Sequence, residues 1–218
     1  MAYNILTINP GSTSTKVALF HDLEQVKTLK LSHSAEEIAQ FASVADQLEW
    51  RLGIILDALK ADGIDLKSLN AVIGRGGLMR PIEGGVYRVG EAMIADLVAP
   101  KRQHASNLGA LIARRIADAA GVEAYIADPV VVDELQDMAR VSGLKELPRR
   151  SIFHALNQKA IARRYAKEVG RPYEDLNLVV VHMGGGISVS AHCKGRVIDT
   201  NNALDGDGPI APERAGTL

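Results

Sequence analysis

The chain has 218 residues, of which 47% are hydrophobic and 23% are charged. This composition is typical of a folded globular protein and excludes an intrinsically disordered chain. The 25 basic and 26 acidic residues nearly cancel, so the charge gives no reason to expect a surface for nucleic acid or an anionic membrane. We therefore expect a small-molecule ligand.

Targeting and redox signals are sparse. The single cysteine, Cys193, cannot form a disulfide within the chain. The opening residues MAYNILTIN lack the basic flank and long apolar stretch of a signal peptide. Because the sequence also contains no run of 18 or more apolar residues, we expect no membrane span and a cytoplasmic setting.

The opening of the chain is predicted to form three strands followed by one helix. The strands are predicted at residues 3–8, 15–20 and 25–31. Ser34 with Glu37 makes a capping box, and apolar residues then recur every three or four positions until Gly63. This pattern predicts a single long amphipathic helix with a glycine stop.

The middle of the chain alternates strands and helices. A short strand is predicted at residues 70–73, and the stretch GRGGLMRPIEGG after it is too rich in Gly and Pro for a regular element. A helix over residues 108–119 ends at Gly121, and the strand EAYIAD stops at Asp128. A further helix is predicted over residues 151–169.

The opening pattern then returns. NILTINPGSTSTKVALF from Asn4 aligns with NLVVVHMGGGISVSAHC from Asn177 at a constant offset of 173, which pairs Asn9 with His182. Each copy reads as strand, polar residue, Gly-rich turn and second strand, and RVIDT supplies a third strand to the second copy. A chance likeness of two turns is the alternative to internal duplication.

The second copy is expected to be incomplete. After its third strand only NNALDGDGPIAPERAGTL follows, which has no helical period and no room for further helix and strand pairs. The sequence thus predicts a first domain over residues 1–148 and the start of a second over residues 149–218.

The turn GSTSTK, from Gly11 to Lys16, has the residue types of a phosphate site. A P-loop requires a glycine directly before the lysine and a helix after it. Thr15 occupies the glycine position, and KVALF has the character of a strand. The P-loop is therefore disfavoured, which leaves a hairpin turn.

A hairpin turn can bind an anion through backbone N–H groups, hydroxyls and a lysine. An ordinary polar hairpin is the alternative for the first turn, but the matching glycine turn favours a phosphate site in each copy. Two such hairpins facing each other across a cleft would clamp a polyphosphate. The predicted phosphate-binding residues are Gly11, Ser12, Thr13, Ser14, Lys16, Gly184, Gly185 and Gly186.

A duplicated β-β-β-α-β-α-β unit with a phosphate hairpin in each copy resembles the actin-like (ribonuclease H-like) ATPase and kinase superfamily, an α/β fold. Within it, INPGSTSTK and GPIAPERAGTL resemble the acetate and butyrate kinase family, and most of all its butyrate kinases. The resemblance implies reversible phosphoryl transfer from ATP to a short-chain carboxylic acid such as butyrate, with Mg²⁺, giving an acyl phosphate and ADP. It also implies a homodimer or higher homo-oligomer.

The resemblance implies roles for two arginines and two histidines. Arg75 stands where the family holds the acyl carboxylate or the phosphoryl group, and Arg214 stands at the second arginine, whose planar fork suits a trigonal phosphoryl. His154 and His182 stand where the family hydrogen-bonds the transferring phosphoryl group. Solvated arginines and structural histidines are the alternatives.

Three further positions follow from the same resemblance. Asp128 looks like the essential aspartate that positions metal and phosphates, and a turn-forming Asp before Pro129 is its alternative. Asn9 stands where the family uses an Asn near Mg²⁺ and phosphate, and His104 falls in the region of a substrate-pocket histidine, at a different spacing from acetate kinases. The pocket, or merely the loop packing, would include Leu78, Met79 and Pro81.

Two rival functions remain. One is a catalytically silent fragment that binds phosphate, and the other is a different actin-like protein such as a sugar kinase or a chaperone ATPase. Those proteins usually carry an Asp at the first strand end or an Asp base for a hydroxyl acceptor. A carboxylate acceptor is already ionised at pH 7 and needs no base, so Asn9 and the two arginines fit a carboxylate kinase better. Acetate or a branched-chain acid is the alternative substrate.

Overall fold

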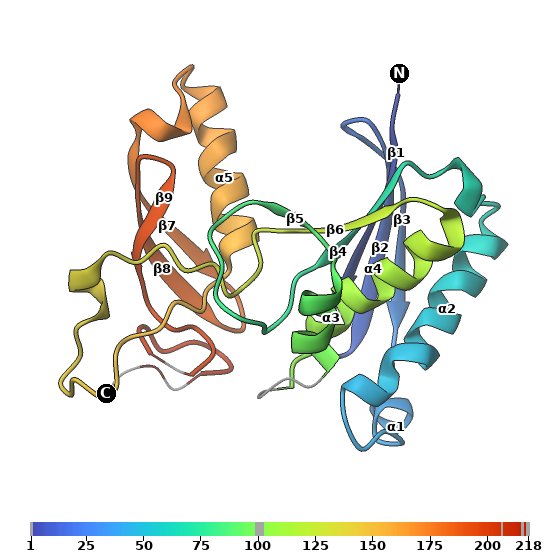
Figure 1. Cartoon of the computed structure of the whole chain (residues 1–218), viewed down its shortest axis with the longest axis horizontal. Helices are drawn as coiled ribbons and strands as arrows, with labels where there is room; N and C mark the ends of the chain where they lie inside the picture. Colours follow the sequence, from blue (N-terminus) through green and yellow to red (C-terminus); the bar gives the residue numbers. More distant parts are fainter. Residues whose placement is uncertain (1, 99–102, 206, 215, 217–218) are drawn as a thin grey trace. The chain divides into compact units, whose positions relative to one another are not determined.

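The structure, a computed structural model, describes residues 2–98, 103–205, 207–214 and 216, and it divides into two compact units (Figure 1). Unit 1 comprises Met1–Met79 and Val86–Ala127, and unit 2 comprises Arg80–Gly85 and Asp128–Leu218. This division by packing falls at Asp128, whereas the predicted domain boundary at residues 148 and 149 concerns the duplicated repeat and stays a prediction.

Unit 1 is built on a six-stranded sheet with the order β3-β2-β1-β4-β6-β5. The first three strands form an antiparallel meander, β4 and β6 lie parallel to β1, and β5 pairs antiparallel with β6. The strands are β1 (Asn4–Pro10), β2 (Ser14–His21), β3 (Glu24–Ser32), β4 (Ala71–Arg75), β5 (Val86–Arg88) and β6 (Glu123–Ala127). The strands predicted in this part of the sequence are confirmed.

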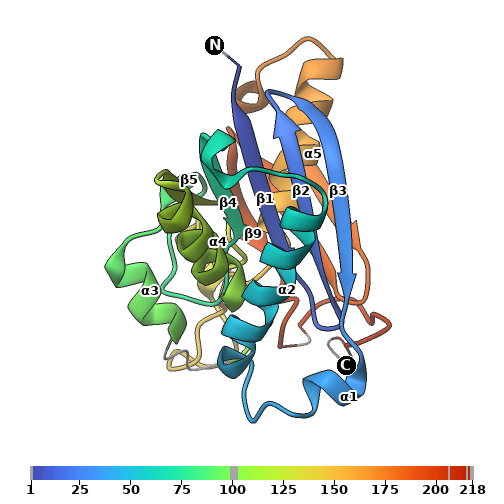
Figure 2. The same ribbon diagram turned by 90° about the vertical axis from the view of Figure 1, so that its right-hand side faces the viewer.

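One face of this sheet is covered by helices α2 (Leu48–Ala61) and α4 (Asn107–Ala120), which lie in front of the strands in Figure 2. Leu6 and Ile8 on β1 are fully buried against them, within one apolar cluster that also contains Ile55 and Ile112. Gly121 ends α4 in the left-handed conformation at φ 79°, as the glycine stop predicted.

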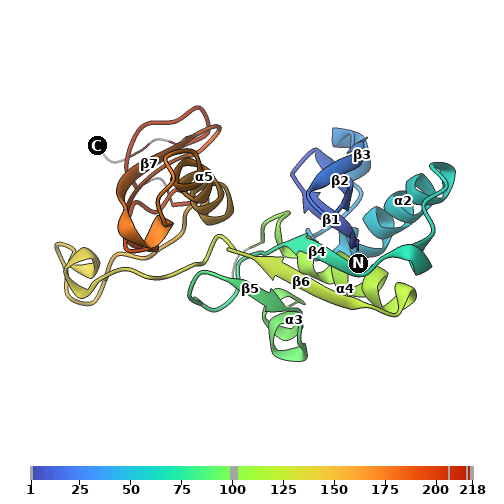
Figure 3. The ribbon, with the colours of Figure 1, turned by 90° about the horizontal axis from the view of Figure 1, so that it is seen from above.

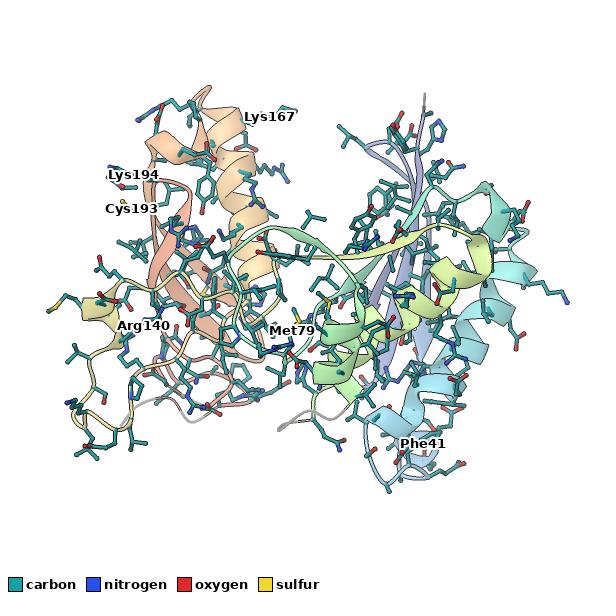
Figure 4. The ribbon with its side chains drawn as sticks, viewed as in Figure 1. Phe41, Met79, Arg140, Lys167, Cys193 and Lys194 are labelled. Carbon is teal, nitrogen blue, oxygen red and sulfur yellow. The ribbon has the colours of Figure 1, made fainter. Side chains whose placement is uncertain are left out.

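The prediction of a single long helix after Ser34 is wrong. The capping box of Ser34 and Glu37 is present, but it starts only the short helix α1 (Ala35–Ile38). Ser43 and Asp46 exchange a second pair of hydrogen bonds, in which the Ser43 N–H donates to the Asp46 carboxylate at 2.9 Å and the Asp46 N–H donates to the Ser43 hydroxyl at 3.3 Å. This second cap starts the 3₁₀ turn η1 (Ala45–Gln47) and then α2, with Phe41 in the connection (Figure 4).

The sequence did not predict β5 or helix α3 (Glu91–Val98), which lie at the β6 edge of the sheet (Figure 3). A three-residue strand is too short for an alternating pattern to stand out. The Gly-rich stretch also begins inside a regular element, since Gly74 and Arg75 belong to β4. The 3₁₀ turn η2 (Leu66–Ser68) precedes β4.

Gly74 and Gly109 let α4 approach β4 closely. A Cβ built on Gly74 would lie 2.2 Å from the Gly109 carbonyl oxygen, and one built on Gly109 would lie 2.2 Å from the carbonyl oxygen of Arg75. Both distances are far inside van der Waals contact, and the neighbouring atoms are backbone. The two glycines therefore fix where Arg75 leaves the sheet.

Unit 2 repeats the opening of unit 1. Its sheet has the order β7-β8-β9, and β7 and β8 begin 173 residues after β1 and β2. The second strand of each copy also carries a register irregularity against the third, at Leu19 and Phe20 in one and at Ala191 and His192 in the other. The predicted duplication is confirmed. The elements are η3 (Asp137–Arg140), α5 (Ala155–Glu168), η4 (Tyr173–Asp175), β7 (Asn177–Met183), β8 (Ile187–Cys193) and β9 (Arg196–Thr200).

The two faces of β7 differ. Leu178 and Val180 pack toward α5, beside Ala162 and Ala166 of that helix. On the other face Val179 is 73% exposed and Met183 is 79% exposed, whereas the equivalent positions in β1 are buried. Among the described residues, the second copy lacks counterparts of the helices that cover β1, as predicted. Among all the residues that the structure describes, no helix is both long enough and apolar enough to cross a membrane.

A buried ion pair joins four segments of unit 2. Lys159 on α5 donates to the Glu134 carboxylate at 2.9 Å, and both side chains are almost fully buried. Glu134 also accepts from the N–H of Val197 at 2.6 Å and of Gly84 at 2.9 Å. Burial alone would raise the pKa of Glu134, but the Val197 N–H and the Lys159 ammonium outweigh it and lower that pKa below its ordinary value.

Replacing Gly109 with alanine is expected to destabilise the protein by at least about 2 kcal/mol, because the new Cβ overlaps the Arg75 backbone. Gly53 in α2 is the matched control, since a Cβ there meets nothing within 4 Å. Gly53→Ala should stabilise by about 0.5–1 kcal/mol. Urea denaturation measures both, and equal effects would contradict the close approach.

Lys159→Met is expected to cost about 3–5 kcal/mol at pH 7, because it leaves the Glu134 charge buried without its partner. Arg164→Met on the same helix breaks only the exposed pair with Glu168 and should cost less than about 0.5 kcal/mol. Urea denaturation across pH measures both variants.

The pH dependence has a defined sign. Since the folded-state pKa of Glu134 lies below 4.5, its ordinary value, its contribution is present above that pH and is lost as the pH falls through the folded pKa. In Lys159→Met the deficit should instead shrink on acidification, because protonation removes the unpaired charge. A deficit independent of pH would contradict this account.

Candidate functional site

The first glycine turn closes β1 and β2. The Gly11 N–H donates to the Ser14 carbonyl at 2.7 Å, and Ser12 and Thr13 lie exposed at the tip. Below the tip, Asn9 and Lys16 are opposite each other in the ladder and therefore share one face of the sheet. The predicted hairpin is confirmed in preference to a P-loop, because no helix follows the turn.

A buried guanidinium holds this turn from behind. Arg51 on α2 is only 1% exposed, and it donates to the carbonyl of Gly11 at 2.8 Å and to that of Ser12 at 3.0 Å. It also donates to Gln47 at 3.0 Å and to the hydroxyl of Thr15 at 3.3 Å. The carbonyl oxygens of the turn are thus drawn toward α2, away from any anion bound at the exposed side.

A buried histidine completes this support. The hydroxyl of Thr15 lies 2.9 Å from Nε2 of His33, whose ring packs against Trp50 at 4.9 Å between centroids. Burial, and next the charge of Arg51, lower the pKa of His33 below its ordinary value. His33 is therefore neutral at pH 7, and its Nδ1 finds no hydrogen-bond partner among the described residues.

Arg75 and Asn9 meet in unit 1. Nη1 of Arg75 donates to Oδ1 of Asn9 at 3.4 Å. Burial lowers the pKa of Arg75, but a guanidinium begins so high that it stays charged at pH 7. His104 instead lies at the start of α4, where its Nδ1 accepts from the N–H of Ser106 at 3.2 Å and lies 2.7 Å from the Ser106 hydroxyl.

The donors present do not make a dedicated metal site. Among the described residues, no group of three or more His, Cys, Asp or Glu side chains is placed to hold a metal ion. Asn9, the predicted metal-side residue, contributes one amide oxygen, which accepts from Arg75. Such a donor set fits a Mg²⁺ ion held mainly by phosphate oxygens and water, as is usual for Mg²⁺ with nucleotides.

The second glycine turn gathers the predicted residues of unit 2. The Gly184 N–H donates to the Gly186 carbonyl at 3.1 Å, and the Gly185 carbonyl accepts from the Glu213 N–H at 2.8 Å. The backbone of Glu213 is thus attached to the turn, and Arg214 follows it directly in the chain. Arg214 is 30% exposed and donates to the Glu213 carbonyl at 2.8 Å.

His154 and His182 stack beside the same turn. Their ring centroids lie 3.8 Å apart with an interplanar angle of 7°. A Cβ built on Gly184 would lie 3.2 Å from Nε2 of His182, and one built on Gly186 would lie 3.5 Å from Cε1 of His154. Two imidazoles, a glycine turn and the segment of Arg214 therefore form one cluster of hydrogen-bond donors.

Asp128 has both carboxylate oxygens engaged. Oδ1 accepts from the Gly85 N–H at 2.8 Å, and Oδ2 accepts from Arg163 of α5 at 2.8 Å. Its backbone lies in the left-handed region at φ 35°, where β6 ends. These contacts suit the turn-forming alternative.

Sequence reasoning missed the residues that support the site. Arg51 falls in the same helical row as the core residues Ile55 and Leu59, and a charge in an apolar row is a usable signal of a buried partner. In unit 2 the corresponding signal was Gln158, a polar residue that lies four positions, or one helical turn, after His154. Asn201 and Asn202, which organise the loop before the tail through hydrogen bonds, gave no pattern.

Arg51→Met is expected to destabilise the protein by about 3 kcal/mol, because the carbonyls of Gly11 and Ser12 lose a buried charged donor. Arg115→Met is the matched control, since Arg115 is exposed and pairs with the exposed Glu49, and it should cost less than about 1 kcal/mol. Urea denaturation compares them, and similar losses would show that Arg51 does not hold the turn.

Residues 143–211 match the model of the Acetokinase family. Butyrate kinase 1 of Clostridium acetobutylicum is 59% identical over 215 residues, covering 98% of this chain and 61% of that protein. Butyrate kinase 2 of the same organism is 56% identical over 219 residues, covering 100% of this chain and 62% of that protein. The chain therefore spans about three fifths of the length of these relatives.

Solved structures show the same fold. The acetate kinase of Entamoeba histolytica matches with a TM-score of 0.66 at 18% identity, over 99% of this chain and 59% of that one. The acetate kinase of Porphyromonas gingivalis matches with a TM-score of 0.64 at 17% identity, over 91% of this chain and 57% of that one. The predicted α/β fold of duplicated actin-like domains, with an incomplete second copy, is confirmed, and so is the resemblance of this sequence to the acetate and butyrate kinase family.

Proposed function

We propose that the protein acts as an ATP-dependent carboxylate kinase, which transfers the γ-phosphoryl group reversibly to butyrate or a similar short-chain acid. The observation that carries this proposal is the cluster in unit 2, where two stacked histidines and the Arg214 segment meet at a glycine turn. The names of the relatives, Butyrate kinase 1 and 2, support the choice of acid.

The chemistry needs charge neutralisation more than proton transfer. A carboxylate oxygen attacks the γ-phosphorus, the bond from that phosphorus to the β–γ bridging oxygen breaks, and ADP leaves as the acyl phosphate forms. The nucleophile is already ionised at pH 7, so no general base is required. Arg75 and Arg214 would neutralise the phosphoryl oxygens, and His154 and His182 would donate hydrogen bonds to them.

Each glycine turn has a proposed share in binding the nucleotide. The turn of unit 1 would supply the Ser12, Thr13 and Ser14 hydroxyls with Lys16 close behind. The turn at Gly184–Gly186 would supply the backbone N–H groups of Gly185 and Gly186, since that of Gly184 bonds within the turn. Mg²⁺, bound with the nucleotide, would neutralise its β- and γ-phosphates, and Asn9 is the residue proposed beside it.

The remaining predicted residues have positioning or substrate roles in this proposal. Asp128 accepts hydrogen bonds from Arg163 and Gly85, and through them it would fix the segment that follows β6. His104, with Arg75, would line the acyl site. A cytoplasmic homodimer or higher homo-oligomer completes the proposal.

A silent phosphate-binding chain is the second candidate function. Two observations favour it, namely the bare face of β7 and the share of the relatives' length that the chain spans. Acetate or a branched-chain acid is the alternative substrate, since one short loop of apolar residues does not define the size of a pocket.

A hydroxamate assay tests the proposal. The chain is incubated with ATP, Mg²⁺ and butyrate, acetate or a sugar, and acyl phosphate is trapped by hydroxylamine; the expected product is butyryl hydroxamate. Arg75→Ala and Arg214→Ala should each lower the rate about 100-fold, because each removes a preorganised charge from the transition state. Arg115→Ala, an exposed arginine paired with Glu49, should leave the rate unchanged.

Calorimetry of ATP binding to the same chain separates the outcomes. Binding without product from any acid would refute the kinase proposal for this chain and support the silent candidate. Phosphorylation of the sugar with no hydroxamate would replace the carboxylate by a hydroxyl acceptor.

A further inference from the structure

A chain of buried hydrogen bonds leads from His154 into the interior of unit 2. Nδ1 of His154 lies 3.0 Å from the Ser188 hydroxyl, and Nε2 of Gln158 lies 2.9 Å from the same hydroxyl. Oε1 of Gln158 lies 3.1 Å from Nε2 of His192, and Nδ1 of His192 lies 2.6 Å from the Tyr173 hydroxyl. Gln158 and Ser188 are fully buried, so the donor and acceptor of each hydrogen bond are set by the neighbouring protein groups.

One group in this chain sets its direction. The backbone carbonyl of Ser188 can only accept, and it lies 2.9 Å from the Gln158 side chain. The amide nitrogen of Gln158 must therefore face Ser188, which turns its oxygen toward His192. That oxygen can only accept, so His192 carries its proton on Nε2 and accepts from the Tyr173 hydroxyl at Nδ1.

The charge state of His192 agrees with this direction. Burial, followed by the charge of Lys159, lowers the pKa of His192 to about 4, against a smaller raising effect of Glu134. His192 is therefore neutral at pH 7, with one donor and one acceptor nitrogen as the chain requires. Burial also raises the pKa of Tyr173, so its hydroxyl keeps the proton that it donates.

The direction continues to His154. The Ser188 oxygen accepts from Gln158 at 2.9 Å and lies 3.4 Å from the His154 backbone N–H, so its lone pairs already face donors. Its own proton then has one acceptor among its described contacts, Nδ1 of His154 at 3.0 Å. A neutral imidazole that accepts at Nδ1 carries its proton on Nε2.

We propose that Ser188, oriented by Gln158, holds His154 as the neutral Nε2–H tautomer, which makes His154 a hydrogen-bond donor to an anion at the glycine turn. Nε2 is on the turn side of the ring, 4.0 Å from a Cβ built on Gly186. Ser188 and Gln158 are thereby positioning residues. Only the identity of the anion as the transferring phosphoryl group rests on the proposed function.

The second histidine follows the same logic. The amide nitrogen of Asn157 lies 2.9 Å from Nδ1 of His182, and with the amide in this orientation a neutral His182 carries its proton on Nε2 as well. Two parallel imidazolium rings with centroids at 3.8 Å would repel each other, so the stacking disfavours two cations at the turn.

Nuclear magnetic resonance of the ¹⁵N-labelled chain tests the tautomer without substrate. Long-range ¹H–¹⁵N correlation of the histidine rings distinguishes protonated from unprotonated ring nitrogens. At pH 7 the expected pattern for His154 is an unprotonated Nδ1 and a protonated Nε2. A wild-type spectrum with the proton on Nδ1 would overturn the proposal.

Variants separate positioning from a merely structural role. Ser188→Ala removes the donor, so the Nδ1–H form of His154 should become populated, and Ser188→Thr should restore the wild-type pattern. Ser190→Ala is the matched control, because Ser190 is equally buried two residues along β8 but bonds Thr200 instead. It should leave His154 unchanged, and an unchanged His154 in Ser188→Ala would sink the proposal.

Gln158→Met covers the case in which a Ser188 variant does not fold. It should shift the ring signals of both His154 and His192, whereas Ser188→Ala should shift mainly those of His154. A Gln158→Met spectrum in which neither histidine moves would overturn the proposal. Since these spectra need no nucleotide, a negative hydroxamate assay with the expected tautomer would refute only the proposed function.

Discussion

A backbone turn presents its N–H groups to an anion more readily when its carbonyl oxygens bond to other groups, and both turns meet this condition in part. In unit 1 the buried Arg51 takes the carbonyls of Gly11 and Ser12. In unit 2 the Glu213 N–H takes the carbonyl of Gly185. A cation suffices for the first turn, whereas the second uses the chain that carries Arg214, so the same requirement also places a proposed functional residue.

The two copies share one further device with different outcomes. Thr15 and Ser188 are equivalent at the offset of 173, and both are fully buried hydroxyls. Each accepts from a helix side chain, Arg51 in the first copy and Gln158 in the second, and each meets a histidine, His33 or His154. Because Thr15 faces the core, His33 is only a support, whereas Ser188 faces the ring that stands beside the glycine turn. The two hydroxyls align in the sequence but differ in the ladder, since Thr15 pairs with Pro10 whereas Ser188 pairs with His182, the counterpart of Asn9.

The sequence was sufficient to predict the duplicated strands and turns, but not the polar residues that support the turns. Alternating strands and Gly-rich turns are local patterns, so both meanders and their offset were predictable, and so was the gathering of His154, His182 and Arg214 from family motifs. The helix after Ser34 was mispredicted because apolar spacing continues across Ser43 and Asp46, whose mutual hydrogen bonds start a new helix. The polar network behind the second turn joins residues up to 34 apart, and periodicity cannot detect such pairs.

The incomplete second sheet does not undermine the geometry of His154, because the two faces of that sheet serve different purposes. His182 and Ser188 are opposite each other in the ladder, as are Val180 and Ser190 and also Leu178 and His192, so all six share the face that packs on α5. The bare apolar residues Val179, Val181 and Met183 point to the other face. Burial on the α5 face, with the Lys159 and Glu134 pair behind it, holds the network without any cover on the bare face. The contacts that orient His154 therefore all lie on the α5 face.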